Sequence, residues 1–332
     1  MPFKNAVRTL ERAVKSIQSQ THPDWELILV DDGSSDGSAE LAKALSKSDA
    51  RIAYKENPVP GIVHALNRGI ASARGEYIAR MDADDKSLPD RLAQQVSFLK
   101  DNKHVGLVSG KVIYEGELER NRGYARYVDW LNHLSSWEQI RANRFVESPF
   151  AHPSVMFRHN LCPRGEEGPY RFGRFPEDYE LWLRWIDEGV RMEKLPLPLL
   201  KWFDGPDRLS RVDKRYDPEA FYLIKSVYLS RWLISNHHDQ REIWIWGAGR
   251  ITRKRAGMLA NQGIQFAGFL DIDPGKAGKE FEGLPVLSHH DWMPKPKGFV
   301  ISYVGNLGAR GKIKQFLQEK GLREERDFIL AA

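Results

Sequence analysis

Hydrophobic and polar positions alternate between two spacings along the first hundred residues. Apolar side chains in residues 7–17 recur at helical intervals after Asn5, a residue that can cap a helix, whereas residues 26–30 form the short apolar run typical of a buried strand. The alternation continues with a helix through Leu41 and Leu45, a strand near residues 52–54, a helix from Gly61, a strand over 77–81 and a helix through Leu92 and Leu99. This order predicts an α/β fold with a parallel, doubly wound sheet covered by helices.

The pattern loosens after residue 105 and becomes regular again near the carboxyl end. We expect a strand to about residue 114, a polar and aromatic stretch to about 153, a helix over 177–188, a connection over 202–217 and a helix over 218–235. A second alternating unit follows, with strands over 243–246, 266–271 and 299–303, helices over 250–262 and through Phe316, and a last strand near Phe328. The sequence therefore predicts an α/β domain over residues 1–216, a linking helix over 217–237 and a small Rossmann-like α/β domain over 238–332.

The composition is that of an ordinary folded protein. Of the 332 residues, 41% are hydrophobic and 29% charged, which excludes a disordered chain. No apolar run approaches the roughly 18 residues that cross a bilayer, and we find no apolar core of a signal peptide. Cys162 is the only cysteine, which excludes an intrachain disulfide and a cysteine-based zinc site. We therefore expect a soluble protein of the cytoplasm.

The positive charge of the chain favours anionic partners. The net charge is +5 and the isoelectric point about 9.1, which suits nucleotide phosphates or an anionic membrane. The cations are scattered and accompany no known nucleic-acid module, so we expect no nucleic-acid partner. The helix over residues 218–235 carries aromatic residues beside Lys225 and Arg231. It leaves two interpretations: peripheral association with the inner face of the plasma membrane, or an apolar face packed between domains, which we favour.

The loop over residues 31–37 combines Asp, Gly and Ser after a buried strand. Its offsets resemble those of a calcium loop, but Lys43 stands where that loop needs a bidentate Glu. Residues 33–37 also match the G-x-S-x-G motif of hydrolases, but no glycine-rich oxyanion loop lies upstream. Two interpretations remain for Asp31 and Asp32: a solvated turn, or acceptors of hydrogen bonds from a nucleoside at the carboxyl end of a strand.

Three aspartates follow the strand over residues 77–81. Positions i and i+2 of an extended chain share a face, so we expect Asp82 and Asp84 to point the same way and Asp85 to point away. Adjacent carboxylates repel unless a cation joins them, and hard oxygen ligands suit Mg²⁺ or Mn²⁺. The alternative is an acidic turn that leads into the next helix.

Several motifs occur together in the order that is typical of one enzyme family. They lie in residues 2–5, 20–21, 31–37, 57–85, 152–158 and 176–184. With these motifs the chain resembles, from residue 1 to about 235, the family 2 glycosyltransferases of the GT-A fold. The resemblance implies an inverting, metal-dependent hexosyltransferase. It would move a sugar from a nucleotide-diphosphate donor, by family habit a UDP-sugar, to a hydroxyl of a glycan or lipid-linked acceptor in surface-polysaccharide synthesis.

The resemblance also implies roles for single residues. Asp84, with Asp82, would hold Mg²⁺ or Mn²⁺, and Asp178, next to Glu177, would be the general base. The donor side would comprise Pro2, Asp31, Asp32, Arg74 and Asp82, and the acceptor side has the candidates His152 and Trp182. The rival hypothesis is a catalytically silent sensor or scaffold for sugar nucleotides. The presence of both Asp84 and Asp178 favours the enzyme.

The position of Asp178 in the chain supports the base independently. Glu177 and Asp178 begin a predicted helix, where the partial positive charge favours an ionised carboxylate. An ionised Asp178 can remove the proton of an acceptor hydroxyl while a metal neutralises the departing diphosphate. The alternative is a first helical turn that contains acidic residues for stability alone.

A glycine-rich turn opens the second unit. Gly247 and Gly249 follow one strand and precede a helix, and Asp271 ends the next strand, where dinucleotide-binding folds place an acid for the ribose. Thr252 stands at the position of the third glycine, so the fingerprint is incomplete. A structural or regulatory role and nucleotide binding both remain open for this turn.

The predicted sheet lacks a strand before Pro2, where the family has its first strand. Unpaired backbone groups are costly when buried. We therefore expect residues 1–4 to form at most a short strand, the strands over residues 27–30 and 77–81 to be poorly bridged, and the natural chain to begin several residues upstream.

Overall fold

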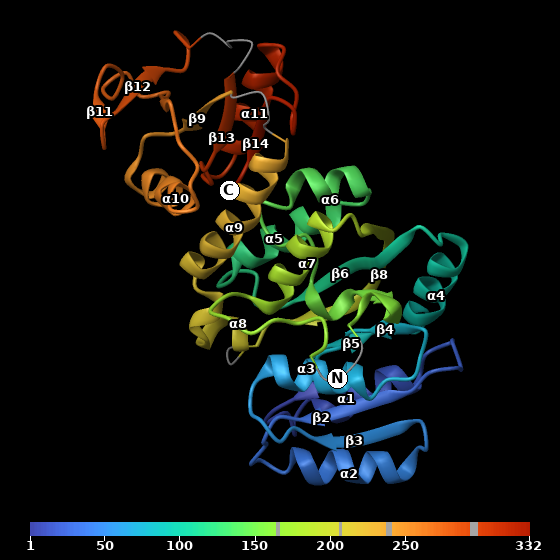
Figure 1. Ribbon diagram of the computed structural model, residues 1–332. Helices are drawn as coiled ribbons and strands as arrows, with labels where there is room; N and C mark the ends of the chain where they lie inside the picture. Colours follow the sequence, from blue (N-terminus) through green and yellow to red (C-terminus); the bar gives the residue numbers. More distant parts are fainter. Residues whose placement is uncertain (164–166, 206–207, 237–240, 293–297) are drawn as a thin grey trace. The chain divides into compact units, whose positions relative to one another are not determined.

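The computed structural model describes residues 1–163, 167–205, 208–236, 241–292 and 298–332 (Figure 1). Contacts divide the chain into two compact units, Met1–Ile140 with Pro149–Asp213, and Arg141–Ser148 with Lys214–Ala332. The junction expected at residues 216–217 lies close to the break at residue 213. The junction expected at 237–238 lies outside the described residues.

The first unit begins with the predicted alternation of strands and helices. Its first half contains β1 (Pro2–Phe3), α1 (Leu10–Gln18), β2 (Leu27–Asp31), α2 (Ser38–Ser48), β3 (Ile52–Glu56) and α3 (Ile62–Ala71). Then come β4 (Tyr77–Ala79), β5 (Lys86–Ser87), α4 (Arg91–Asp101), β6 (Val105–Glu115), α5 (Arg122–His133), η1 (His152–Ser154), β7 (Met156–Arg158), η2 (His159–Leu161), α7 (Glu177–Asp187), β8 (Arg191–Phe203) and α8 (Leu209–Val212). The expected α/β fold is confirmed.

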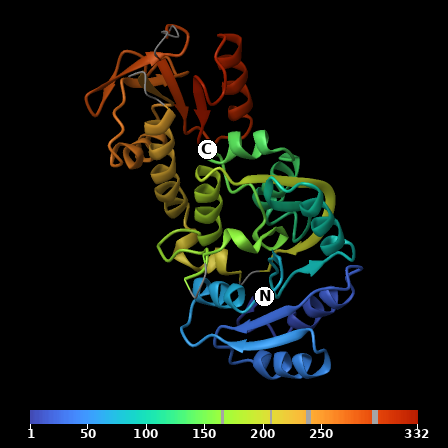
Figure 2. The ribbon, with the colours of Figure 1, turned by 45° about the vertical axis from the view of Figure 1, so that its right-hand side comes forward.

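The strands of the first unit form two sheets. A parallel sheet has the order β1–β2–β3, and α2 lies along β3 on the side away from the second sheet (Figures 1 and 2). The second sheet has the order β4–β7–β6–β8–β5 and mixes parallel and antiparallel pairs. The purely parallel sheet that we expected is therefore limited to the first three strands.

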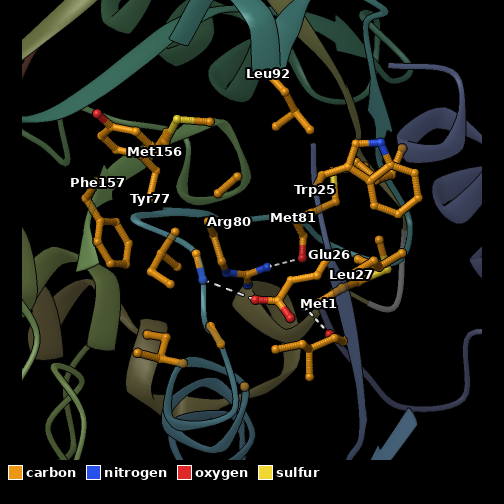
Figure 3. A pocket seen from close by; sticks show the side chains of 18 of the residues that line it. Met1, Trp25, Glu26, Leu27, Tyr77, Arg80, Met81, Leu92, Met156 and Phe157 are labelled. Atoms are coloured by element: carbon orange, nitrogen blue, oxygen red, sulfur yellow. Dashed lines mark hydrogen bonds between the residues drawn. The ribbon is translucent and has the colours of Figure 1, made fainter. Parts of the chain in front are cut away.

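The expected gap beside the first strand is present. β1 is two residues long and pairs with β2 alone, and in the described residues no hydrogen-bonded pair joins β2 to β4. A cavity of about 740 Å³ is lined by residues of both strands and by Met1 and Arg80 (Figure 3). The Met1 ammonium donates a hydrogen bond to the Ile28 carbonyl at 2.9 Å, and burial lowers its pKa to about 5.

The sequence pattern did not predict two segments of the first unit. The predicted polar stretch after β6 contains α5 and α6 (Trp137–Asn143), the latter spanning the boundary between the units. β8 contains Pro196 and Pro198, and proline is unusual inside a strand with two partners. The register explains the exception, because Gly110 of β6 pairs with Leu195 and Lys111 with Pro198, so that residues 196 and 197 bulge out of the pairing.

The second unit has the strand order of a doubly wound fold. It contains η3 (Lys214–Tyr216), α9 (Pro218–Asn236), β9 (Glu242–Trp246), α10 (Arg250–Ala260), β10 (Gly268–Asp271), β11 (Glu280–Phe281), β12 (Leu284–Ser288), β13 (Gly298–Ser302), α11 (Ala309–Glu319) and β14 (Phe328–Leu330). The sheet order is β11–β12–β10–β9–β13–β14, and all pairs except β11–β12 are parallel. The direction of winding changes between β9 and β13, the point where such folds bind ligands.

Helix α9 is tied to the second unit by a buried lysine. The Lys225 ammonium donates hydrogen bonds to the carbonyls of Val146 at 3.2 Å and Ala331 at 3.1 Å. Burial lowers the pKa of Lys225 to about 7. The helix that we expected to link the domains is thus fixed to two other segments of the second unit, at Val146 and at Ala331.

A single buried amide connects three elements of the first unit. The Gln20 side chain follows α1 and is 8% exposed. Its Nε2 donates hydrogen bonds to the Ser16 carbonyl at 3.0 Å and the Leu88 carbonyl at 2.8 Å, and its Oε1 accepts one from the Leu92 amide at 2.9 Å. The amide therefore joins the end of α1 to the β5–α4 connection.

Replacing Gln20 with Ala should lower the free energy of unfolding by about 2–4 kcal/mol, because buried carbonyl and amide groups lose their partners. Denaturant unfolding of the Gln20→Ala variant measures the loss. Gln18→Ala is the matched control, since Gln18 makes one part-buried hydrogen bond, to Asp49 at 3.3 Å, and should cost under about 1 kcal/mol. Equal losses in the two variants would contradict the role of Gln20.

Candidate active site

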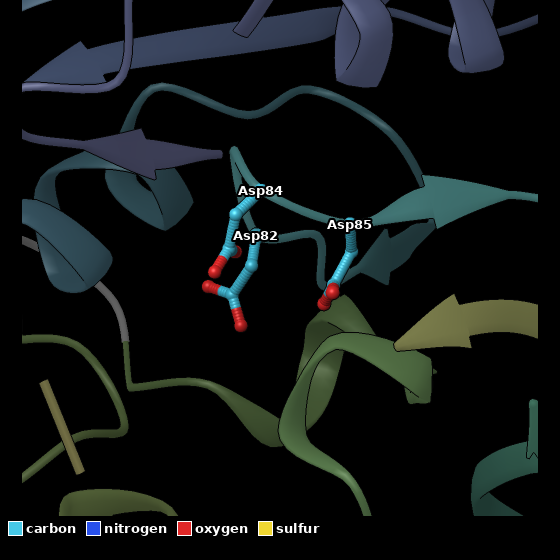
Figure 4. Close-up of side chains that lie close together, drawn as sticks. All are labelled: Asp82, Asp84 and Asp85. Carbon is cyan, nitrogen blue, oxygen red and sulfur yellow. The ribbon is translucent and has the colours of Figure 1, made fainter. Parts of the chain in front are cut away.

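Three carboxylates converge in the turn between β4 and β5. The ligand oxygens of Asp82, Asp84 and Asp85 lie within 4.8 Å of one another (Figure 4). Our expectation that Asp85 points away is wrong, because β4 ends at Ala79 and the chain turns at residues 83–84 instead of staying extended. The turn brings the third carboxylate to the other two.

Crowding and burial oppose ionisation of these aspartates. Burial, and then the neighbouring Asp82, raise the pKa of Asp84 to about 6. Burial and Asp84 also raise the pKa of Asp85 well above its usual range. One oxygen of Asp85 accepts a hydrogen bond from the Phe203 amide at 2.8 Å, whereas Oδ2 is buried and has no partner among the described residues. Clustered carboxylates and an unsatisfied buried oxygen fit a hard divalent cation such as Mg²⁺ or Mn²⁺.

Arg80 is the counter-charge of Asp82 in the acidic turn, and sequence reasoning missed it. Its guanidinium forms an ion pair with Asp82 at 2.6 Å. Its Nε donates a hydrogen bond to Nε2 of His152 at 3.2 Å, and the same ring nitrogen lies 2.7 Å from the Tyr170 hydroxyl. Burial and the charge of Arg80 hold the pKa of His152 well below its usual range, so the ring is neutral and able to accept.

The structure buries both residues that we expected on the acceptor side. The His152 side chain is 9% exposed and accepts a hydrogen bond from Arg80. Trp182 is 0% exposed and packs against the rings of Phe150, His152 and Trp185. Their acceptor-side roles stay predictions, and their burial favours packing within the core.

Two more arginines come to the acidic turn from distant parts of the chain. Arg12 of α1 donates a hydrogen bond to the Asp84 carbonyl and lies over the Phe203 ring at 3.8 Å. Arg208 lowers the pKa values of Asp84 and Asp85 by its charge. Its guanidinium donates a hydrogen bond to the Tyr124 hydroxyl at 3.2 Å. Neither arginine belongs to a motif, so no sequence signal could have found them.

Asp178 lies in the first turn of α7, as expected. Its Oδ1 accepts a hydrogen bond from the Tyr179 amide at 2.7 Å. Burial and the adjacent Glu177 nevertheless raise the pKa of Asp178 to about 7, while Arg80 opposes the rise. We expected the helix terminus to favour an ionised carboxylate, and at Asp178 desolvation and the second acid act against this effect. The shifted pKa suits a group that accepts a proton near neutral pH.

Asp31 and Asp32 lie at the carboxyl end of β2. They differ in whether a carboxylate oxygen remains without a hydrogen-bond partner in the described part of the chain. Asp31 is 6% exposed, and its two oxygens accept hydrogen bonds from the Ser34 amide at 2.9 Å and the Tyr54 hydroxyl at 3.3 Å. One oxygen of Asp32 accepts bonds from the Asn57 side chain at 2.6 Å and the Gly61 amide at 2.8 Å. The second oxygen of Asp32 has no partner in the described part of the chain. Pro2 is buried in the neighbouring β1.

Arg74 lies at the opposite end of the same strands. It precedes β4 and forms an exposed ion pair at 3.1 Å with Glu26, which precedes β2. The five residues of β2 separate this pair from Asp31 by roughly 15 Å. The structure thus separates Arg74 from the aspartates with which the sequence grouped it, because strand polarity places it at the amino edge of the sheet.

Comparison with known proteins identifies the family of this site. The family model "Glycosyl transferase family 2" matches residues 1–162. The glycosyltransferase EpsE of Bacillus subtilis is 31% identical over 229 residues, which cover 68% of this chain and 78% of EpsE. The chain is a family 2 glycosyltransferase. The catalytic unit of this glycosyltransferase has the α/β GT-A fold that the motifs implied.

Other relatives cover similar parts of the enzyme. The O-antigen biosynthesis glycosyltransferase WbnJ of Escherichia coli is 29% identical over 226 residues, 67% of this chain and 82% of WbnJ. The crystal structure of TarS 1–349 of S. aureus in complex with UDP-GlcNAc has a TM-score of 0.48 at 15% identity, over 78% of this chain and 69% of that one.

In the residues that the structure describes, no helix is long and apolar enough to cross a bilayer.

The position of Arg74 makes a prediction for the glycosyltransferase. Arg74→Gln should change kcat and the KM for the sugar donor by less than about twofold, since an exposed ion pair contributes under about 1 kcal/mol. Arg80→Gln is the comparison, and it should lower kcat/KM at least about tenfold because it removes the partner of Asp82. Steady-state kinetics measure both. A rise in donor KM of tenfold or more for Arg74→Gln, at unchanged melting temperature, would restore Arg74 to the donor site.

Proposed function

We propose that this glycosyltransferase moves a sugar from a nucleotide-diphosphate donor, by preference a UDP-sugar, to the hydroxyl of a glycan or lipid-linked acceptor with inversion of the anomeric centre. The observation that carries the proposal is the pairing of two different acidic groups around Arg80. One is the crowded turn of Asp82, Asp84 and Asp85, and the other is Asp178 with a pKa of about 7. The first suits a diphosphate with its cation, and the second suits a hydroxyl that must lose a proton.

The donor side follows from the acidic turn and the end of β2. Asp84 and Asp82 would hold Mg²⁺ or Mn²⁺, and the unsatisfied Oδ2 of Asp85 supports the same site from its buried side. The cation supplies charge neutralisation for the departing diphosphate. The free oxygen of Asp32 makes this residue the better acceptor for a nucleoside, because both oxygens of Asp31 are engaged in the fold.

The acceptor side follows from Asp178. Its carboxylate removes the proton from the acceptor hydroxyl as that oxygen attacks the anomeric carbon, and the bond from this carbon to the diphosphate oxygen breaks. One displacement from the face opposite the leaving group inverts the configuration. Glu177 keeps the pKa of Asp178 high by its charge, which strengthens Asp178 as a base near neutral pH.

The biological setting is proposed from the relatives and the composition. WbnJ carries O-antigen biosynthesis in its name, which supports a role in surface-polysaccharide synthesis. The single cysteine in 332 residues supports the proposed cytoplasmic location. The rival function, a silent sensor of sugar nucleotides, is an outcome of the first test below.

Incubation with a panel of nucleotide sugars, with Mn²⁺ or EDTA, tests the proposal. Donor hydrolysis or transfer in Mn²⁺ is expected, with UDP-sugars used best and no turnover in EDTA. Asp178→Asn should keep donor affinity within about threefold and lower kcat about 10²-fold or more, the scale of general-base catalysis. Asp84→Asn should instead abolish the metal-dependent part of donor binding.

Two results would contradict this assignment. Tight donor binding without turnover under any condition would favour the sensor over the enzyme. Equal losses of donor affinity in Asp178→Asn and Asp84→Asn would show that the two carboxylates do not have separate roles. Calorimetry of donor binding and turnover assays on the same preparations distinguish these outcomes.

The raised pKa of Asp178 predicts the pH dependence of turnover. The base must be ionised, so kcat/KM should rise with pH through about 7 and fall about tenfold for each pH unit below it. A pH–rate profile between pH 5 and 9 in Mn²⁺ measures this limb. Glu177→Gln removes the neighbouring charge and should move the limb to lower pH. A flat profile down to pH 5 would contradict Asp178 as the base.

A further inference from the structure

The second unit contains a large cavity at the carboxyl ends of its central strands. Its volume is about 1450 Å³, and all of its lining residues belong to this unit. Gly247 after β9, Asp271 at the end of β10 and Val304 after β13 lie in its wall. This is the switch point between β9 and β13, where doubly wound sheets bind ligands.

Asp271 does not have the role that the sequence pattern gives it. Its Oδ2 accepts hydrogen bonds from the Ala248 amide at 2.7 Å and the Lys276 ammonium at 3.1 Å, and its Oδ1 accepts one from the Asp273 amide at 2.9 Å. These bonds outweigh burial and lower the pKa of Asp271. An acid so engaged holds the glycine turn in place, and a ribose would have to displace one of these partners.

The glycine turn leaves open space before α10. Gly247 has φ +98°, and a Cβ there would lie 2.8 Å from the Val304 side chain, so this position requires glycine. At Gly249, the residue before α10, a Cβ would meet no atom within 4 Å. No side chain caps α10, so the amides of its first turn face this space without a side-chain partner.

The charges at the amino end of α10 are positive, whereas negative charges stabilise the amino end of a helix. Its first turn contains no acidic residue, while Arg250, Arg253, Lys254 and Arg255 all lie in its first half. Cations at the positive end of a helix are unfavourable unless an anion is present. Arg250 and Lys312 both line the cavity, and neither has an ion-pair partner in the described part of the chain.

A polar side chain in the cavity wall provides a second, independent observation. The Thr252 side chain lines the cavity and is 7% exposed. Among the described residues its Oγ1 has no hydrogen-bond partner, and it lies 3.1 Å from the position of a Cβ on Gly247. The hydroxyl therefore keeps its hydrogen-bonding capacity for a group inside the cavity. A ligand oxygen above the glycine turn would satisfy Thr252 and the free amides together.

We infer that this cavity binds a nucleotide, with a phosphate over the turn at Gly249 and the start of α10. Arg250, Lys312 and Thr252 would contact the phosphate oxygens. The cavity wall also carries Ile251 and Ile272, which are 66% and 67% exposed, together with buried Trp246. These apolar surfaces suit a base, which inorganic phosphate lacks. The site is separate from the acidic turn and does not depend on the proposed donor site.

The test uses the full chain in EDTA with UDP, GDP, ADP and pyrophosphate as probes. EDTA removes the divalent cation that the proposed donor site needs, so that binding at the acidic turn does not obscure the cavity, in whose wall Asp271 pairs with Lys276 and Glu219 with Lys254. At least one nucleotide should bind in calorimetry and slow hydrogen exchange of the amides in residues 247–253. Pyrophosphate should bind more weakly, since it lacks the base.

Matched variants on one helix separate the site from general charge. Arg250→Gln and Thr252→Val should each weaken nucleotide binding about fivefold or more, the scale of one lost hydrogen bond. Arg253→Gln removes the same charge from α10, but Arg253 does not line the cavity and pairs with Glu282 at 3.7 Å. It should change binding less than about twofold.

Three results would overturn the inference. They are exchange protection confined to the first unit, equal losses in Arg250→Gln and Arg253→Gln, and pyrophosphate binding as tightly as every nucleotide. Melting temperatures of the three variants, compared with the unsubstituted chain, verify that each is folded.

Discussion

Electrostatic repulsion among three carboxylates is the constraint on which the catalytic unit depends. Asp82, Asp84 and Asp85 are held in one turn, and burial makes their mutual repulsion stronger than it would be in water. The fold offsets this repulsion with arginine side chains that are themselves held in place by hydrogen bonds and ion pairs. Arg80 pairs with Asp82 and Arg12 bonds to the turn backbone, while one Asp85 oxygen lacks a partner among the described residues. The remaining excess of negative charge is the basis of the cation site proposed for this turn.

The fixed geometry of Arg80 comes from a chain of buried hydrogen bonds. The Asn67 side chain of α3 donates to the Tyr170 carbonyl at 2.9 Å and accepts from its amide at 3.1 Å. The Tyr170 hydroxyl lies against His152, which accepts from Arg80. Each member is satisfied by the next, so the network rigidifies the site rather than destabilising the core. The network also explains how a buried neutral histidine is held beside Arg80.

The second unit presents the opposite electrostatic problem. Its glycine turn is held by Asp271, and the helix that follows has cations at its positive end and no capping side chain. In the first unit an excess of negative charge favours a cation, and in the second an excess of positive charge favours an anion. The same reasoning from local charge and unsatisfied groups therefore supports both proposed ligands, one for each unit.

The sequence by itself determined the local elements and the chemical character of the main site. Hydrophobic spacing located the strands and helices of the first hundred residues, and the acids after β4 and at the start of α7 were visible as motifs, because periodicity is a property of neighbouring residues. The cap expected at Asn5 is wrong, since α1 begins at Leu10 after Thr9. Convergence was decided only by the tertiary structure. A turn brought Asp85 to the other aspartates, strand polarity carried Arg74 to the far edge, and packing buried His152 and Trp182. Arg208 is far from the acidic turn in the sequence and comes close to it only because the chain folds back. The desolvation that raises the pKa of Asp178 depends on the residues packed around it in the folded protein. Neither effect can be read from the neighbouring sequence.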